Sequence, residues 1–218
     1  MRRYLLTSTG LVNDPIKQAF LDLLPKPAKD ITVAFIPTAK NLNTNDKRYF
    51  MRVLLSLDEL GVKKIDFVDI DAIKKEYWLP RLEAADVIYV GGGNTYYLLN
   101  SIRNSGLISE LPRLLESRLY VGDSAGGIVI TPSIDIAAVD DGDENIISIK
   151  DTKGLGLIGF EVSPHTPEDV SIKGNKEYSK TSPNAIYAFD DHSAIKVNGS
   201  KIEQIGNGHW SFNTLDLQ

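Results

Sequence analysis

The chain of 218 residues has no cysteine and only three histidines. It can therefore form no disulfide, thiolate metal site or cysteine nucleophile, so covalent catalysis would have to use a serine or an acidic side chain. No apolar run approaches the roughly 20 residues of a membrane span. The apolar stretch after Met1 ends at Asp14 and Pro15, too early for a secretion signal. We expect a soluble, cytoplasmic protein that does not contact membranes.

An excess of positive charge is also absent. The chain carries 24 Lys and Arg against 29 Asp and Glu, a formal net charge of -5, which argues against a nucleic-acid-binding surface. The sequence contains no metal-ligand cluster and no cofactor motif, so we expect neither group. A small molecule or a peptide is the expected substrate, and the protein is expected to be a monomer or a homodimer.

The length and the 42% hydrophobic content suit one core, so we interpret residues 1–218 as a single domain. Apolar strands alternate with helix-period segments, a pattern typical of a doubly wound, mostly parallel sheet with helices on both faces. Strands are predicted at 4–7, 31–36, 64–68, 87–90 and 119–121, with helices at 15–24, 46–60, before 85 (a pair) and within 95–117. Four short strands from residue 185 onwards, with turns at Asn198-Gly199 and Asn207-Gly208, predict a C-terminal antiparallel β meander.

The most informative segment is Leu-Tyr-Val-Gly-Asp-Ser-Ala-Gly-Gly at residues 119–127. An apolar strand ends there in a Gly-x-Ser-x-Gly turn, and a helix-compatible run follows. Glycines at 122 and 126 leave room for the tight turn of a nucleophile elbow, which raises the serine hydroxyl above the end of a sheet. Ser124 is therefore the candidate nucleophile.

A second glycine-rich turn, Gly91 to Thr95, also follows a strand and opens a helix. The free N–H groups at Gly92, Gly93 and Asn94 could face an anion and form an oxyanion hole. The alternatives are a phosphate cradle, or a packing turn in which Asn94 only caps the next helix. The turn matches neither the dinucleotide-binding nor the Walker pattern, so nucleotide binding is not expected.

A serine hydroxyl needs a neighbouring base, and His165 is the first candidate. It lies between Pro164 and Pro167, in a stiff loop that suits a positioned base, although an exposed loop histidine is the simpler interpretation. His192 is expected in a turn before a strand, and His209 on a hairpin surface.

These motifs, Gly-Gly-Gly-Asn-Thr, then Gly-x-Ser-Ala-Gly, then Ser-Pro-His, together with Phe-Ile-Pro-Thr-Ala at a strand end, resemble in order and spacing the peptidase E family, the S51 serine peptidases. The resemblance covers most of the chain. It implies a fold similar to class I glutamine amidotransferases, a flavodoxin-like three-layer arrangement, with serine in place of their cysteine. It also implies Ser124 as nucleophile and His165 as base, with N–H groups of Gly93 and Ala125 facing the oxyanion.

The same resemblance places an acid that orients the histidine near residue 190, and Asp191 is our choice. Its neighbour Asp190 would face the other side of a strand end. An acidic run offers further alternatives, although a solvated loop is the simpler interpretation of it. The run consists of Asp140, Asp141, Asp143 and Glu144.

Two departures from the family bear on the substrate. Aspartyl dipeptidases of the family carry an arginine after the base histidine, whereas no arginine follows Arg118 here, so strict preference for N-terminal aspartate is not expected. Asp123 stands where those enzymes have tryptophan. Our hypothesis is that its carboxylate lies at the substrate pocket, where it would repel acidic side chains and attract an ammonium group.

The sequence thus predicts a serine peptidase that hydrolyses short peptides, with dipeptides as the expected substrates, through a Ser124 acyl-enzyme with His165 as general base. One alternative is an α/β-hydrolase-like esterase, whose base would be a late histidine such as His192 or His209. Another is a catalytically inactive binding protein with an amidotransferase-like fold. The side-chain preference of the substrate is not encoded in any motif we identify.

Overall fold

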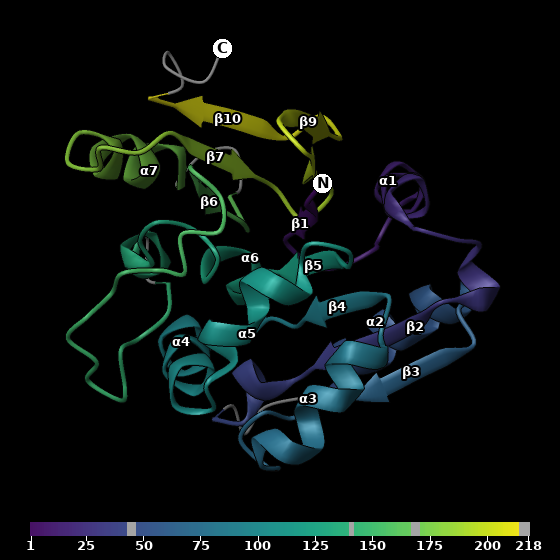
Figure 1. The fold of residues 1–218 in the computed structure, drawn as a ribbon. Helices are drawn as coiled ribbons and strands as arrows, with labels where there is room; N and C mark the ends of the chain where they lie inside the picture. The colour runs from purple at the N-terminus through teal and green to yellow at the C-terminus, as the bar shows by residue number, and fades with distance from the viewer. Residues whose placement is uncertain (43–46, 140–141, 167–170, 214–218) are drawn as a thin grey trace.

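A computed structural model describes residues 1–42, 47–139, 142–166 and 171–213 of the chain. A seven-stranded sheet forms its centre, and a three-stranded sheet lies beside it (Figure 1). The strands are β1 (Arg3–Thr7), β2 (Thr32–Ile36), β3 (Lys64–Phe67), β4 (Val87–Val90), β5 (Leu119–Asp123), β6 (Glu161–Ser163), β7 (Ile186–Phe189), β8 (Ala194–Asn198), β9 (Lys201–Ile205) and β10 (His209–Phe212). The helices are α1 (Asp14–Leu23), α2 (Arg48–Glu59), α3 (Lys75–Ala84), α4 (Thr95–Asn104), α5 (Leu107–Leu114), α6 (Ala125–Ile128) and α7 (Ser171–Ser179), with short 3-10 turns η1 (Ala28–Asp30), η2 (Thr38–Lys40) and η3 (Asp135–Ala138).

The large sheet has the strand order β3-β2-β4-β5-β1-β8-β9. The strands from β3 to β1 in this order are parallel, and β8 and β9 continue the sheet in antiparallel pairing. The predicted α/β fold with a mostly parallel sheet is confirmed. Because parallel strands end at the same edge, the carboxyl ends of β1, β2, β4 and β5 meet there, which is where open sheets of this kind bind ligands.

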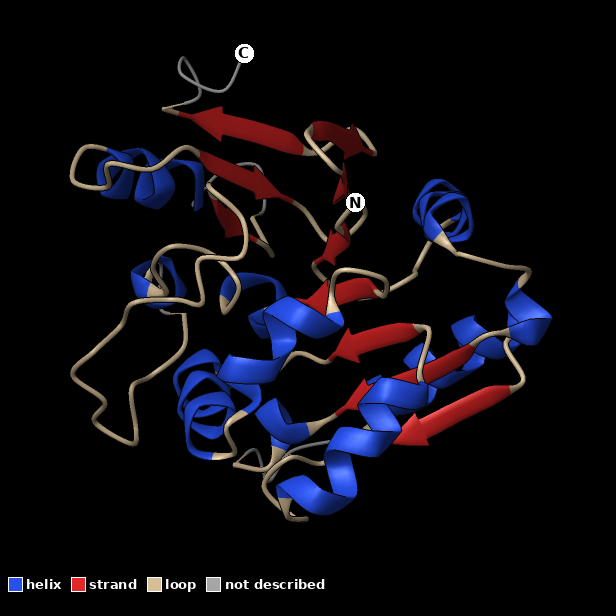
Figure 2. Ribbon diagram, in the orientation of Figure 1, coloured by secondary structure: helices blue, strands red, loops and turns tan. Residues whose placement is uncertain are grey.

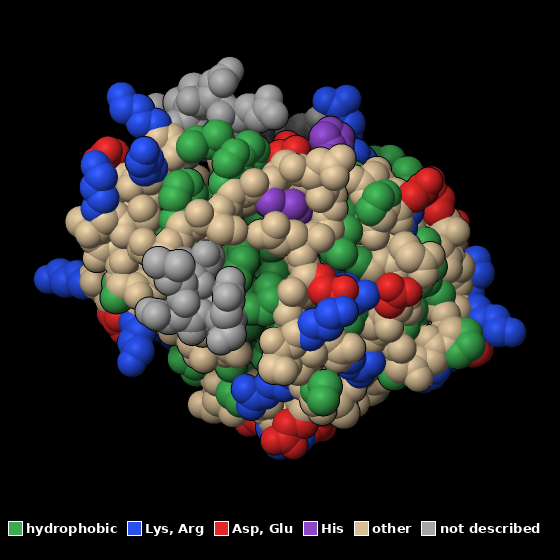
Figure 3. Space-filling view, turned by 90° about the horizontal axis from the view of Figure 1, so that it is seen from above, with side chains coloured by type: hydrophobic (Ala, Val, Ile, Leu, Met, Phe, Trp, Pro, Cys, Tyr) green, Lys and Arg blue, Asp and Glu red, His purple; other side chains and the backbone are tan. Residues whose placement is uncertain are grey.

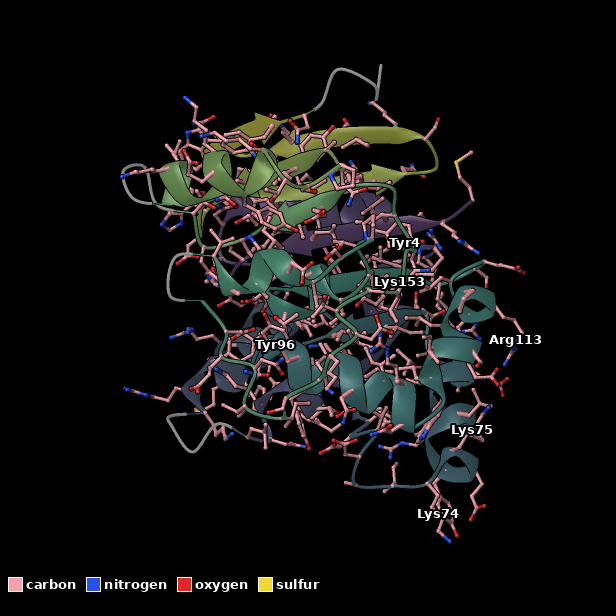
Figure 4. The ribbon with its side chains drawn as sticks, turned by 90° about the vertical axis from the view of Figure 1, so that its left-hand side faces the viewer. Tyr4, Lys74, Lys75, Tyr96, Arg113 and Lys153 are labelled. Carbon is pink, nitrogen blue, oxygen red and sulfur yellow. The ribbon has the colours of Figure 1, made fainter. Side chains whose placement is uncertain are left out.

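Helices cover both faces of this sheet (Figure 2). On one face, apolar side chains of α1 and α2 pack on strand residues such as Val33 and Val121. On the other face, α3, α4, α5 and α6 pack on residues such as Ile88 and Tyr120. Burial on both faces explains why β4 and β5 are apolar throughout most of their length rather than alternating. On the outer surface, Lys75 of α3 and Arg113 of α5 both pair with Glu110 (Figure 4).

The C-terminal strands form where predicted and are antiparallel, but they are divided between two sheets. The Asn198-Gly199 turn joins β8 to β9, with Gly199 at φ +63° as a tight hairpin requires. In the small sheet, β7 pairs antiparallel with β10 and parallel with β6. The Asn207-Gly208 turn is therefore not a hairpin, because the free edge of β1 takes β8 and leaves β7 to pair elsewhere.

Two helix predictions change in detail. The predicted helical pair before residue 85 is the single helix α3, which follows a turn. The predicted start near Asp46 lies outside the described residues, and α2 begins at Arg48.

Candidate active site

Ser124 occupies a strained turn between β5 and α6. Its backbone has φ +51° and ψ -115°, which few non-glycine residues adopt. Its N–H donates to the carbonyl of Thr7 at 2.8 Å, which fixes the turn to the end of β1. A Cβ atom at Gly126 would lie 2.1 Å from the carbonyl oxygen of Val90, so only glycine allows α6 to approach β4 this closely. These features give the predicted elbow geometry, with Ser124 at the carboxyl edge of the sheet.

The side chains of Ser124, His165 and Asp191 lie in one hydrogen-bonded chain. The Ser124 Oγ is 2.9 Å from the His165 Nε2, and the His165 Nδ1 is 2.6 Å from an Asp191 carboxylate oxygen. His165 follows β6 and Asp191 follows β7, and these strands are parallel, so both loops leave the small sheet at the same end. Two sheets thus supply the three groups, with the serine from one and the histidine and acid from the other.

The other candidate acids have different partners. The Asp190 carboxylate accepts from the N–H of His192 at 2.9 Å, and the Asp143 carboxylate accepts from the N–H of Thr95 at 2.7 Å. Glu144 accepts through its backbone carbonyl from the Asn94 side chain. Asp140 and Asp141 lie outside the described residues. Asp191 is therefore the acid that contacts the imidazole of His165 within the described part of the chain.

The two later histidines do not hydrogen-bond to Ser124 in the part of the chain that the structure describes. The ring of His209 is half-buried against Phe189, and its Nε2 lies 2.9 Å from the carbonyl oxygen of Ile205. His192 is exposed before β8. The esterase alternative requires one of these rings beside the serine, so the observed geometry disfavours it.

The contact between His165 and Asp191 shifts the pKa values of both side chains. Burial lowers the pKa of His165, but the hydrogen bond and charge of Asp191, with the charges of Asp123 and Asp143, outweigh it, so the pKa is raised overall. The hydrogen bond from His165 lowers the pKa of Asp191. Asp191 is thus held as a carboxylate that stabilises the imidazolium form of His165, as an orienting acid must.

Two hydroxyl groups that the sequence analysis overlooked connect these loops to β1. The Ser8 Oγ accepts from the N–H of His165 at 3.0 Å and donates to the carbonyl of Asp190 at 2.9 Å. The Thr9 hydroxyl donates to the carbonyl of Asp191 at 2.9 Å. Their place in the sequence indicates this role, because polar residues directly after an apolar parallel strand lie at the ligand-binding edge of the sheet.

The N–H groups of the triple-glycine turn are used unequally. Those of Gly91 and Asn94 donate to the carbonyls of Ile36 and Ala39, and that of Gly92 donates to the Tyr49 hydroxyl at 3.1 Å. Within the described residues, the N–H of Gly93 has no partner, and neither has that of Ala125 beside the serine.

Asn94 behaves as the simpler alternative predicts. Its side chain accepts from the N–H of Tyr97 and caps α4. The backbone of Gly93 requires glycine, because its φ is +152° and a Cβ atom would lie 2.2 Å from the carbonyl of Ala39. The N–H groups of Gly93 and Ala125 therefore remain the candidate oxyanion donors, and Gly92 and Asn94 shape the turn that carries Gly93.

The structure corrects the hypothesis that the Asp123 carboxylate lies at the substrate pocket. Alternation along β5 sends its side chain to the face covered by α2, where it is 0% exposed. There it accepts hydrogen bonds from the hydroxyls of Tyr49 and Thr7. Burial raises the pKa of Asp123 to about 7, although Tyr49, His165 and Thr7 oppose the shift.

Two cavities of about 180 Å³ each adjoin Ser124 and His165 on opposite sides. One is lined by apolar residues of the α6–η3 region, together with Asp143 and the buried Asn175, whose carbonyl oxygen has no partner among the described residues. The other contains Lys40, Arg52 and the glycine turn. Figure 3 shows a histidine near the middle of the face seen from above, bordered mainly by uncharged polar and backbone atoms, with a mixed group of acidic and basic side chains to one side of it.

None of the helices in the described ranges is both long and apolar enough to cross a bilayer. Among the described residues, no group of three or more His, Asp or Glu side chains is arranged to hold a metal ion.

Comparison with known proteins places the chain in a family. The family model for peptidase family S51 matches residues 4–205. An uncharacterized peptidase of Listeria monocytogenes is 30% identical over 179 residues, with 78% of this chain and 84% of the relative covered. A peptidase E of Nostoc is 26% identical over 185 residues, with 80% of this chain and 72% of that protein covered.

A solved structure agrees with these sequence matches. The crystal structure of a candidate peptidase E protein from Listeria monocytogenes superposes with a TM-score of 0.80 at 26% identity, covering 95% of this chain and 100% of the other. The same fold occurs in a peptidase from an acI-B1 actinobacterium, with a TM-score of 0.66 at 18% identity. The chain belongs to peptidase family S51 and is a peptidase.

Proposed function

We propose that this peptidase hydrolyses short peptides, dipeptides in particular, by a serine mechanism with Ser124 as nucleophile and His165 as general base. The observation that carries the proposal is the 2.9 Å separation of the Ser124 Oγ and the His165 Nε2, continued by the 2.6 Å contact between His165 and Asp191. Both distances lie within the reach that proton transfer between these groups demands.

In the first half-reaction, His165 accepts the hydroxyl proton while the Ser124 oxygen attacks the peptide carbonyl carbon. For this step the imidazole proton must sit on Nδ1, from which it is hydrogen-bonded to the Asp191 carboxylate, so that Nε2 is free to act as base. The negative charge that develops on the carbonyl oxygen is stabilised by the N–H groups of Gly93 and Ala125. When the tetrahedral intermediate collapses, the C–N bond breaks, and His165 delivers its proton to the leaving amine.

The second half-reaction removes the acyl group. His165 takes a proton from a water molecule, whose oxygen attacks the ester carbon of the acyl-enzyme. Collapse of the second tetrahedral intermediate breaks the bond to the Ser124 oxygen, which recovers its proton from His165. The carboxylic acid product leaves, and the enzyme returns to its starting state.

The size and charge of the cavities support a short substrate. Each cavity is about 180 Å³, below the roughly 300 Å³ at which drug-sized sites begin. Lys40 and Arg52 on one side form no ion pair within the described residues and suit a carboxylate. The Asp143 carboxylate and the unpartnered oxygen of Asn175 on the other side suit an ammonium group. A dipeptide with free ends presents both charges.

A dipeptide library assayed against the wild type, Ser124→Ala and His165→Ala tests the mechanism. We expect both variants to lose turnover by roughly 10³-fold or more, and only proteins that retain Ser124 to form a covalent adduct with a fluorophosphonate. Full activity of either variant on a confirmed substrate would refute the serine mechanism. A folded wild type that neither reacts with the probe nor turns over any dipeptide would favour the binding-protein alternative. Blocking the substrate's C-terminus as an amide is expected to raise KM.

A further inference from the structure

A hydrogen-bonded chain runs behind the nucleophile, on the α2 face of the sheet. The Thr7 hydroxyl donates to one Asp123 carboxylate oxygen at 3.3 Å, and the Tyr49 hydroxyl donates to the other. The Tyr49 oxygen in turn accepts from the N–H of Gly92 at 3.1 Å. Asp123 is fully buried, and it is the residue that precedes Ser124 in the chain.

The order of donors and acceptors fixes the direction of this chain. A phenol can donate one hydrogen bond, and the Asp123 carboxylate accepts that bond, so the lone pairs of the Tyr49 oxygen are left to face Gly92. Burial, with the nearby Asp123 charge, raises the pKa of Tyr49 well above its usual value, which keeps that proton on the phenol. Tyr49 therefore links the buried carboxylate to the glycine turn as a neutral bridge.

In the glycine turn, the backbone N–H groups of Gly91, Gly92 and Asn94 form hydrogen bonds, whereas that of Gly93 has no partner among the described residues. Gly91 is bonded to Ile36 at 3.0 Å and Asn94 to Ala39 at 2.9 Å. The N–H of Gly92 donates a hydrogen bond to the Tyr49 hydroxyl. A Cβ atom at Gly92 would lie 3.0 Å from the Cβ of Ser124, so the turn packs directly on the nucleophile.

The adjacent peptide, between Gly92 and Gly93, carries the N–H of this turn that has no partner among the described residues. An oxyanion donor must lie within roughly 2.7–3.1 Å of the charged oxygen. Glycine offers no side chain to hold such a donor in place, so bonds made by its neighbours must do so.

We propose that Tyr49 is a positioning residue of this enzyme: supported by Asp123, it fixes Gly92 so that the N–H of Gly93 meets the oxyanion formed when Ser124 attacks. The inference rests on the proposed serine mechanism. Tyr49 touches no reacting atom and acts through the backbone it holds.

Tyr49→Phe tests the inference, because it removes the hydroxyl and keeps the ring. We expect kcat to fall by roughly 10- to 100-fold, somewhat less than for deletion of an oxyanion donor, with KM within about threefold of the wild type. Affinity for a dipeptide boronic acid, whose tetrahedral adduct occupies the oxyanion site, should fall by a similar factor.

Tyr89→Phe is the matched control. The Tyr89 hydroxyl is also buried on this face, near Gly10 and Asp123, but it makes no contact with the glycine turn in the described part of the chain. This variant should keep wild-type kcat and boronate affinity. Melting temperatures of both variants separate a loss of stability from a loss of positioning.

A conservative variant adds an independent test should Tyr49→Phe fail to fold. Asp123→Asn keeps an oxygen that can accept from Tyr49 and should retain kcat within about threefold, whereas Asp123→Ala should lose kcat as Tyr49→Phe does. If Tyr49→Phe matches Tyr89→Phe in kcat and boronate affinity, the positioning role is refuted. If instead Ser124→Ala remains active, the serine mechanism itself fails, whatever the tyrosine variants do.

Discussion

The hydroxyl of Ser8 accepts a hydrogen bond from the backbone N–H of His165 at 3.0 Å. His165 has a positive φ of +57°, a conformation that a non-glycine residue keeps only when its surroundings hold it. The same hydroxyl donates to the carbonyl of Asp190, so a single side chain at the end of β1 braces both the base loop and the acid loop.

Replacing Ser8 should therefore impair catalysis without removing a reacting group. We expect Ser8→Ala to lower kcat by roughly 10- to 100-fold, because a displacement of about 1 Å at the base has effects of that order. Steady-state kinetics on a confirmed dipeptide substrate measures this. Ser56→Ala is the control. Among the described residues the Ser56 hydroxyl bonds to the Arg52 carbonyl on α2 and not to the catalytic loops, so its loss should leave kcat unchanged. Equal kcat in both variants would contradict the bracing role.

The pH profile should report on Asp191. His165 works as a base only when neutral, so kcat/KM of the wild type should rise with pH through the pKa of His165, which lies above the ordinary value of about 6.5. Asp191→Asn removes the carboxylate, whose hydrogen bond and charge contribute most to raising the pKa of His165, so the rising limb of the profile should move to lower pH. The same substitution should lower kcat/KM by up to roughly 10⁴-fold.

Asp190→Asn is the matched control for this experiment, because the Asp190 carboxylate bonds to the His192 N–H instead. Profiles between about pH 5 and 9 distinguish the two. A rising limb that stays at the same pH in Asp191→Asn would show that a group other than Asp191 determines the pKa of the general base.

Asp123 should make the folded protein less stable as the pH rises. Its pKa is raised to about 7 in the folded state and is about 3.9 unfolded, so between these values the folded state binds the extra proton. The sign is therefore negative: stability from this group falls by about 1.4 kcal/mol per pH unit from about pH 4 to 7 and levels off above. Asp123→Asn should remove this loss, with an advantage that grows to about 4 kcal/mol. Chemical denaturation at several pH values checks it, and a pH-independent difference would be the contrary result.

Gly126→Ala should destabilise the protein, although alanine ordinarily stabilises a helix by about 1 kcal/mol relative to glycine. The new Cβ atom would lie 2.1 Å from the carbonyl oxygen of Val90, a backbone atom that cannot move aside alone. We expect the free energy of unfolding to fall by about 1–3 kcal/mol or more. Gly159→Ala, where nothing lies within 4 Å of the added atom, should be nearly neutral. Similar melting temperatures for both variants would argue against a tight elbow.

The parallel core was predictable because β1, β2, β4 and β5 are buried along nearly their whole length, so each carries a local run of apolar residues. Val87–Val90 was predicted with the observed bounds, since four consecutive apolar residues are bounded by an acid and a glycine. The C-terminal strands are only partly buried, and they were predicted from short strand-like runs separated by Asn-Gly turns. Their division into two sheets was not predictable, because it depends on which distant edge, that of β1 or β6, each strand meets.

The site follows the same pattern. Ser124 and the glycine turn have local motifs, and the resemblance to a family pointed to His165. Tyr49 and Asp123 were different: Tyr49 lies on α2 with no neighbouring motif, and the buried direction of Asp123 depends on its register along β5. Contacts between residues 74 positions apart, like theirs, leave no trace in spacing.

The position of β1 has a consequence for how the enzyme becomes active during its synthesis. In the large sheet β1 lies between β5 and β8, and the Ser8 hydroxyl donates to the carbonyl of Asp190, 182 positions later in the sequence. Contacts of such sequence separation form late in folding, and synthesis proceeds from the N-terminus. A nascent chain would thus contain the serine elbow before its base and acid have been synthesised, and proteolysis would begin only after the segment that carries His165 and Asp191 had emerged and folded.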